Sequence, residues 1–131
     1  IDLILVIIYV FLYNLIAGIP GSDSLEEMPL FLLFIALVIA APLLEEILFR
    51  GYLLDKIRNL HSDNFAIMMT GILFGLMHYD ILSPLDFSQP GSATIGGFLY
   101  AWLRIKTGSL WPSMICHSLW NGTIFFLVFV I

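Results

Sequence analysis

The stretch MPLFLLFIALVIAAPLLEEILFR (residues 28–50) places two adjacent carboxylates at the end of a long apolar segment. Residues 28–44 carry no charge, and a helix needs about 20 apolar residues to cross the hydrocarbon core of a bilayer. An ionised side chain at the bilayer centre costs about 2.5–3.5 kcal/mol on insertion scales, so such side chains face a bundle interior or a wet cavity. The stretch therefore predicts a membrane helix with a functional site at Glu45 and Glu46.

The composition supports a membrane protein. Hydrophobic residues make up 60% of the 131 residues and charged residues only 11%, whereas a soluble domain usually carries about 25% charged residues. We expect one all-α transmembrane domain over residues 1–131, and a fragment lacking amino-terminal helices because the chain begins at Ile1. No basic tract is present, which argues against nucleic acid as a partner and leaves the lipid bilayer as the surroundings. The single Cys116 reads as a small apolar core residue.

Four further apolar stretches bring the predicted helical bundle to about five helices. They cover residues 3–19, 65–77, 93–103 and 110–131. The first and last of these can cross a bilayer, like residues 28–44, but the middle two are short. The short pair is either two tilted spans or a re-entrant pair, with residues 80–92 inside a protein-lined cavity.

The charges are sorted among the linkers. All basic residues fall in residues 50–64 and 104–109. Because basic residues near helix ends mark the cytoplasmic side, we expect the amino end and these two linkers in the cytoplasm, with the carboxyl end outside.

The two glutamates at the end of the second stretch differ in their surroundings. Arg50 lies four residues after Glu46, so the two can form an ion pair on one helical face. Glu45 is turned away by about 100°, which suits a structural Glu46 and a reactive Glu45. Pro42 removes the helical partner of the Val38 carbonyl, so a kink or a water is expected there. The alternative is a charged cluster that reaches out to the membrane surface.

Two histidines lie on other apolar stretches. Phe74 and His78 are four residues apart, as are His117 and Asn121, and each pair shares a helical face. Each pair alone has a structural alternative, because His and Asn also hydrogen-bond between helices. One shared cavity would satisfy Glu45 together with both pairs. A carboxylate can take a proton from water, and His and Asn donors can stabilise an oxyanion, so the set predicts amide hydrolysis.

Other chemistries fit the sequence less well. No serine lies in a GxSxG motif and no HExxH is present. Glu45, His78 and His117 could also form a two-histidine, one-carboxylate site for a divalent metal such as zinc, which stays open as an alternative.

Three motifs in order resemble one family. They are EExxxR at Glu45, Glu46 and Arg50, FxxxH at Phe74 and His78, and HxxxN at His117 and Asn121. Their order and spacing resemble the CPBP family of intramembrane proteases, named for CAAX proteases and bacteriocin processing, which includes type II CAAX prenyl endopeptidases and Abi-like proteins. The resemblance covers most of the chain.

The resemblance implies a role for each motif residue. Glu45 would activate water with His78 as its partner, His117 and Asn121 would form the oxyanion site, and the rest of the first motif would support Glu45. It implies an intramembrane endopeptidase of the bacterial cytoplasmic membrane, with a site open toward the cytoplasm. The substrate would be a membrane-associated peptide or protein, of prenylated CAAX or bacteriocin type. The family has been described both as metal-dependent and as metal-free.

Two other functions and one difficulty accompany this prediction. A non-catalytic membrane immunity or peptide-binding protein would keep its function without Glu45. A proton relay or transporter is disfavoured, because no inverted repeat is visible. Counting about 1.5 Å per residue from the predicted cytoplasmic linkers puts Glu45 and His117 roughly 10 Å deep but His78 about 20 Å deep. A shared site needs these depths to agree.

Overall fold

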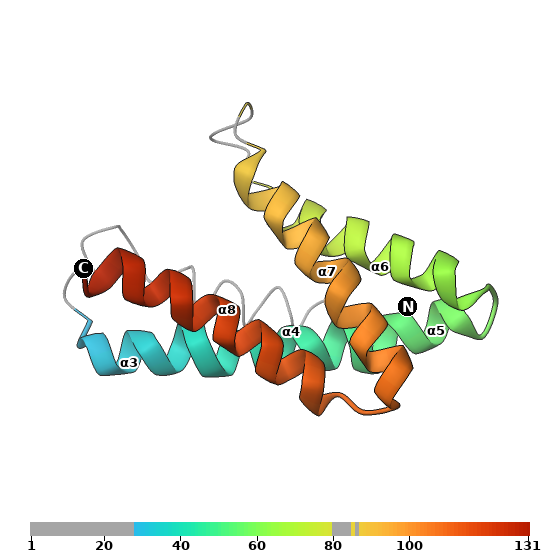
Figure 1. Cartoon of the computed structure of the whole chain (residues 1–131), viewed down its shortest axis with the longest axis horizontal. Coiled ribbons are helices and arrows are strands. Elements are labelled where there is room, and N and C mark those ends of the chain that lie inside the picture. The colour runs from blue at the N-terminus through green and yellow to red at the C-terminus, as the bar shows by residue number, and fades with distance from the viewer. Residues whose placement is uncertain (1–27, 80–84, 86) are drawn as a thin grey trace.

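The computed structural model describes residues 28–79, 85 and 87–131, and these form helices without a strand. The first long helix runs without a break over Leu30–Arg58. It consists of α3 (Leu30–Phe34), the π-helical η1 (Ile35–Ala40), α4 (Ala41–Glu46), the π-helical η2 (Ile47–Leu53) and α5 (Leu54–Arg58). It is followed by α6 (Asp63–Met77), α7 (Ser88–Thr107) and α8 (Trp111–Phe129), as Figure 1 shows. The all-α prediction is confirmed for these residues, whereas the predicted helix at 3–19 lies outside them.

Within the described residues, two helices are long and apolar enough to cross a membrane. These are Leu30–Arg58 and Trp111–Phe129, the second and fifth predicted stretches. Only 22% of the most apolar window of each is buried inside the structure. A core helix of a soluble protein would bury most of its residues, so the exposed apolar faces suit lipid or further membrane helices.

Two predicted boundaries are wrong. The linker expected from residue 50 begins only after Arg58, because the charge of Arg50 is neutralised inside the helix by Glu46. The fourth helix is not short, since α7 has 20 residues and already begins at Ser88. Its polar first turn includes Pro90, which a first helical turn tolerates because the N–H groups there have no helical partner. The third helix, α6, is short as predicted, with 15 residues. The re-entrant alternative concerns residues 80–92, of which 80–84 and 86 lie outside the described part and 88–92 form the start of α7.

Helix α7 packs closely along α6 and also contacts α8 and η2. At Gly97 an added Cβ would lie 2.9 Å from the Gly71 Cα, so glycine permits the close approach of α6 and α7. Helix α7 ends at Gly108, whose φ of 68° is a left-handed cap that most side chains disfavour. The capping N–H of Gly108 donates to the Arg104 carbonyl.

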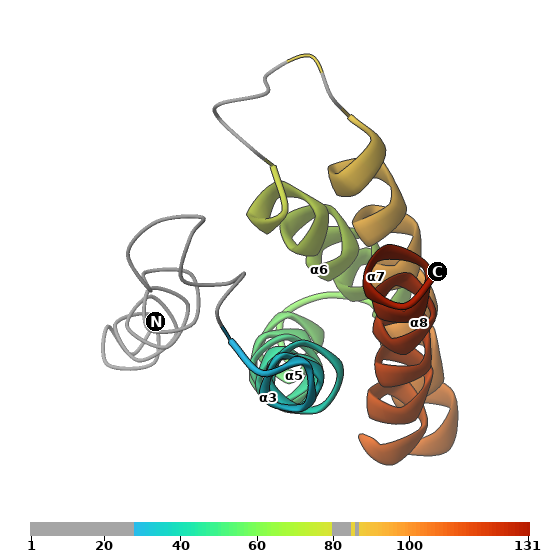
Figure 2. The same cartoon turned by 90° about the vertical axis from the view of Figure 1, so that its left-hand side faces the viewer.

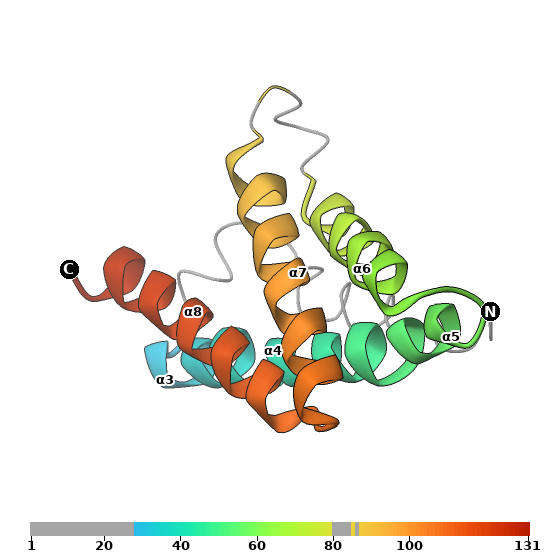
Figure 3. The same cartoon turned by 45° about the vertical axis from the view of Figure 1, so that its right-hand side comes forward.

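The helices converge on the middle of Leu30–Arg58. Figure 2 looks along this helix and shows α6, α7 and α8 grouped on one side of it. In Figure 3, α7 and α8 start from their short connection and diverge, so that α8 follows α3 while α7 follows α6. Helix α8 contacts α4, and α6 and α7 contact η2. The end of α4 is therefore the place where three separate helices can present side chains to one another.

Candidate active site

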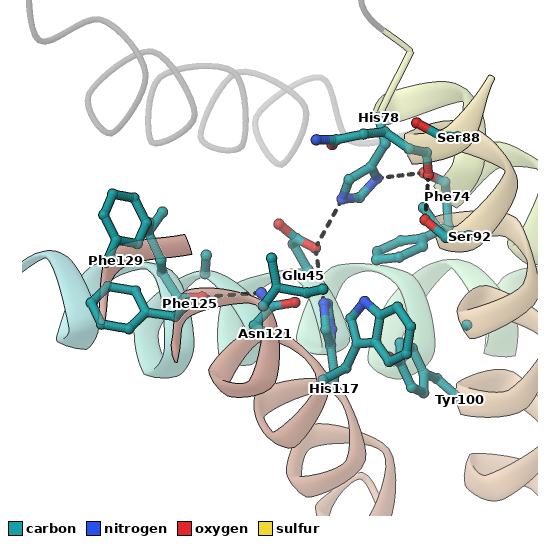
Figure 4. Close-up of a pocket in the computed structure, with 17 residues that line it drawn as sticks. Glu45, Phe74, His78, Ser88, Ser92, Tyr100, His117, Asn121, Phe125 and Phe129 are labelled. Atoms are coloured by element: carbon teal, nitrogen blue, oxygen red, sulfur yellow. Dashed lines mark hydrogen bonds and ion pairs between the residues drawn. The ribbon is translucent and has the colours of Figure 1, made fainter. Parts of the chain in front are cut away.

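Glu45 lies between the two predicted histidines. Its Oε2 atom is 4.0 Å from His78 Nε2 and 3.8 Å from His117 Nε2, as the dashed lines in Figure 4 show. The carboxylate comes from α4, His78 from the end of α6 and His117 from α8. The side chains of Glu45 and His117 are 17% and 4% exposed. The structure therefore brings together three side chains that the sequence placed on three different helices.

The corrected end of the first helix resolves the depth difficulty between Glu45 and His78. Because this helix continues to Arg58, Glu45 lies about 20 Å from its end at about 1.5 Å per residue. By the same rise, His78 lies about 22 Å from Asp63, where α6 begins. The earlier mismatch came from ending the second stretch at Leu44 and beginning its linker at Arg50.

The ring of His78 is held by the backbone of its own helix. Its Nδ1 atom lies 2.8 Å from the Phe74 carbonyl oxygen. Because a carbonyl only accepts, Nδ1 carries the proton and donates, which leaves the Nε2 lone pair toward Glu45. The rings of Phe74 and His78 also contact each other, with centroids 4.7 Å apart. The FxxxH spacing thus orients the imidazole as well as placing it.

The ring of His117 is held by Glu46. Its Nδ1 atom is 3.1 Å from Glu46 Oε1, and the same oxygen accepts a hydrogen bond from Arg50 Nη1 at 2.9 Å. Glu46 and Arg50 are both fully buried. Glu46 therefore accepts from the Nδ1–H of His117 as well as from Arg50, and this contact turns Nε2 toward Glu45. The predicted Glu46–Arg50 pair is confirmed, but its contact with His117 was not foreseen.

Arg50 does not reach the membrane surface. Its guanidinium carbon lies 4.4 Å from the centre of the Phe74 ring and 5.2 Å from that of Tyr100, and Nη2 donates to the Gly97 carbonyl at 3.1 Å. A buried charge needs such partners, and aromatic faces attract a cation. The alternative of a cluster that reaches out to the headgroups is therefore wrong for Glu46 and Arg50.

The side chain of Asn121 hydrogen-bonds to a backbone carbonyl of the first helix that lacks a helical partner. Its Nδ2 donates to the Leu37 carbonyl at 3.0 Å. In the π-helical turn before Pro42, the Ala41 N–H bonds to Ala36, so the next carbonyl, of Leu37, would need the N–H that proline lacks. The sequence predicted a freed carbonyl at Val38. The wider winding of η1 moves the carbonyl that lacks a helical partner to Leu37, and a side chain rather than a water meets it.

Tyr100 is a site residue that sequence reasoning missed. Its ring stacks on His117, with centroids 4.8 Å apart and planes at 19°, and it is 4% exposed. Its only signal in the sequence is an aromatic residue with a polar tip inside the short fourth stretch. Such a residue is common in membrane helices, so the signal does not distinguish a site.

These side chains line one cavity of about 540 Å³, which we call the reaction pocket. Its walls include Glu45, His78, Tyr100, His117 and Asn121. Apolar side chains complete it, and the polar first turn of α7 lies at its edge. Small-molecule pockets usually enclose about 300–1,000 Å³, so this cavity has the size of a ligand pocket.

The distances among Glu45, His78 and His117 can be compared with those between the ligands of a zinc ion. Ligands 2.0–2.1 Å from a tetrahedral ion lie about 3.3 Å apart, whereas Glu45 Oε2 is 3.8 Å and 4.0 Å from the two imidazole nitrogens. Within the described residues, no three His, Cys, Asp or Glu side chains are grouped to hold a metal ion. A metal would therefore require Glu45, His78 and His117 to move together.

Comparisons with known proteins match the chain to one family. The sequence profile of the family described as "Type II CAAX prenyl endopeptidase Rce1-like" matches residues 27–123, which contain every motif residue. The chain is 27% identical over 99 residues to "Putative membrane peptidase YdiL" of Bacillus subtilis (strain 168), covering 76% of the chain and 37% of that protein. It is 32% identical over 103 residues to "UPF0177 protein YxdF" of Lactococcus lactis subsp. lactis (strain IL1403), covering 74% of the chain and 50% of that protein. The chain thus spans half or less of these relatives. No solved structure matches it.

Proposed function

Because the chain belongs to the Rce1-like family of type II CAAX prenyl endopeptidases, we propose that it is an intramembrane endopeptidase that hydrolyses its substrate with water activated by Glu45. The observation that carries the proposal is the position of the Glu45 carboxylate between two oriented imidazoles in the reaction pocket. Both imidazoles have Nδ1 engaged elsewhere, by Phe74 and Glu46, so both direct Nε2 to the same oxygen.

The distances suit a bridging water. Gaps of 3.8 Å and 4.0 Å between Glu45 Oε2 and the two nitrogens are too long for direct hydrogen bonds. A polar contact longer than 3.5 Å is often bridged by one water. Glu45 Oε2 is buried and has no direct hydrogen-bond partner within the described part of the chain. A water held there can donate one hydrogen bond to Glu45 and the other to the Nε2 lone pair of His78.

The reaction then follows from these positions. Glu45 takes a proton from the water, and the water oxygen attacks the carbonyl carbon of the scissile bond. The contact of Nδ1 with Glu46 holds His117 with Nε2 toward Glu45, where an Nε2–H can donate to the oxyanion. Asn121 uses one amide hydrogen on Leu37 and offers the other to the pocket. When the carbon–nitrogen bond breaks, the amine leaves with a proton from Glu45, and a carboxylic acid and an amine are released.

The substrate proposal is a protein or peptide at the membrane, of prenylated CAAX or bacteriocin type. The reaction pocket lies among apolar helices, which favours a substrate that partitions into the bilayer. An active site open toward the cytoplasm and a location in the bacterial cytoplasmic membrane belong to the same proposal, on the basis of the basic residues near Arg58 and Arg104. The mechanism uses a free water and keeps zinc as an alternative to be tested.

The test compares protein termini in cells that express the full-length protein or its Glu45→Gln variant at matched levels. Mass spectrometry should find new termini that disappear in Glu45→Gln. Asp55→Asn is the matched control, because it makes the same carboxylate-to-amide change on the same helix, at a side chain 41% exposed and paired with Arg104. Identical termini in wild type and Glu45→Gln, with the biological effect retained, would instead indicate a peptide-binding or immunity protein.

A further inference from the structure

A second cavity, of about 440 Å³, lies between α7 and α8 beside the reaction pocket. Four residues line both cavities, namely Ser92, Gly96, Tyr100 and Trp120. The other walls of the second cavity are largely apolar and include Leu119. The two cavities are therefore neighbours that share a wall, and the helices that line the second cavity, α7 and α8, diverge from their connection in Figure 3.

The second cavity begins next to the reacting groups. Cys116, which lines it, directly precedes His117, and the Tyr100 ring that stacks on His117 forms part of its wall. Gly96 lines both cavities, and a Cβ there would lie 3.3 Å from ring carbons and the hydroxyl of Tyr100. A group in the second cavity would thus share the wall formed by Tyr100 with the reaction pocket.

We propose that the second cavity is a subsite that binds a bulky apolar side chain of the peptide substrate, next to the scissile bond. The inference rests on the proposed function. Successive side chains of an extended peptide point to opposite sides, so a carbonyl presented to Glu45 leaves a neighbouring side chain free to enter the gap. Continuity with the reaction pocket favours the substrate itself over a lipid chain, because the occupant must adjoin the peptide at Tyr100 and Trp120.

The proposed subsite predicts that the enzyme prefers large side chains at one substrate position beside the cleaved bond. Membranes with the full-length protein are incubated with a detergent-solubilised peptide library from a digested proteome, and the residues flanking each cleaved bond are identified by mass spectrometry. Leu119→Trp fills the second cavity, whereas Ile115→Trp is the control, one helical turn away, similarly exposed and outside both linings. Wild type should favour Phe, Trp, Leu or Met at one flanking position. Leu119→Trp should lower that preference relative to Ala by at least about tenfold, and Ile115→Trp should leave it unchanged.

The variants distinguish a failure of the proposed subsite from a failure of the proposed endopeptidase function. If wild type and Glu45→Gln give the same peptides, the endopeptidase proposal fails. The subsite is refuted if cleavage depends on Glu45 but Leu119→Trp keeps the wild-type size preference. It is also refuted if Leu119→Trp lowers all cleavages equally, which is the result expected when a lipid or a covering helix is lost from the cavity. Should Leu119→Trp not fold, Leu119→Ala serves in its place. It enlarges the cavity and must shift the preference toward larger side chains, and an unchanged preference overturns the inference.

Discussion

The hydrogen bond between Asn121 and Leu37 can be tested by a double-mutant cycle with Pro42. Asn121→Ala leaves the partly buried Leu37 carbonyl without its side-chain donor. An unmet buried acceptor costs about 1–3 kcal/mol, and the better helix propensity of alanine returns about 0.5 kcal/mol, so we expect a net loss of about 0.5–2.5 kcal/mol. Pro42→Ala restores a backbone N–H, and the Leu37 carbonyl then finds a donor whether the turn stays π-helical or becomes α-helical. Asn121→Ala should therefore cost at most about 0.5 kcal/mol in the Pro42→Ala background.

The free energy of unfolding is measured by denaturant titration in detergent micelles for wild type, the two single variants and the double variant. Coupling of about 1 kcal/mol or more is expected, because residues that share one acceptor do not act additively. Additive costs within about 0.5 kcal/mol would refute the reasoning. The same proteins also address catalysis. If the stable double variant remains inactive, Asn121 acts on the substrate in addition to holding Leu37, whereas restored activity would limit it to positioning α8.

Three further predictions concern the Glu46–Arg50 pair, the contact between α6 and α7, and zinc. Glu46→Gln removes the charge that balances Arg50, so the free energy of unfolding should fall by about 3 kcal/mol, which is at the low end for a broken buried pair because the amide oxygen still accepts a hydrogen bond. Adding Arg50→Met should recover most of this loss in the same unfolding assay. A Glu46→Gln variant as stable as wild type would contradict the pairing. Gly97→Ala forces α6 and α7 apart, with an expected loss of about 1–3 kcal/mol, whereas Gly91→Ala on the same helix meets no atom within 4 Å and should be neutral or slightly stabilising. Glu45-dependent cleavage should persist after dialysis against EDTA, with elemental analysis of the purified protein showing less than one zinc per chain; zinc-restored activity would favour the metal alternative instead.

The sequence predicted the class of fold and much of the site because both depend on short-range regularities. Apolar length located the helices Leu30–Arg58 and Trp111–Phe129, and four-residue spacing located the pair of Glu46 and Arg50. The boundary at Arg50 was wrong because charge was read as a sign of solvent. A guanidinium with a carboxylate, a carbonyl and aromatic rings as partners can stay inside a membrane helix, and those partners come from segments that one-dimensional spacing does not connect.

The contacts that the sequence did not predict divide the adjacent glutamates into two environments. One oxygen of Glu46 is shared by Arg50, one turn later in the same helix, and by His117 of α8. Glu45, one residue earlier, faces the reaction pocket and both Nε2 atoms. The turn of about 100° between neighbouring helical residues is enough to separate a fully buried ion pair from a carboxylate that lines the reaction pocket. His117 joins the two, because one ring nitrogen contacts each glutamate. A substitution at Glu46 should therefore alter the chemistry proposed for Glu45 through the orientation and charge of His117, without any contact between Glu46 and the substrate.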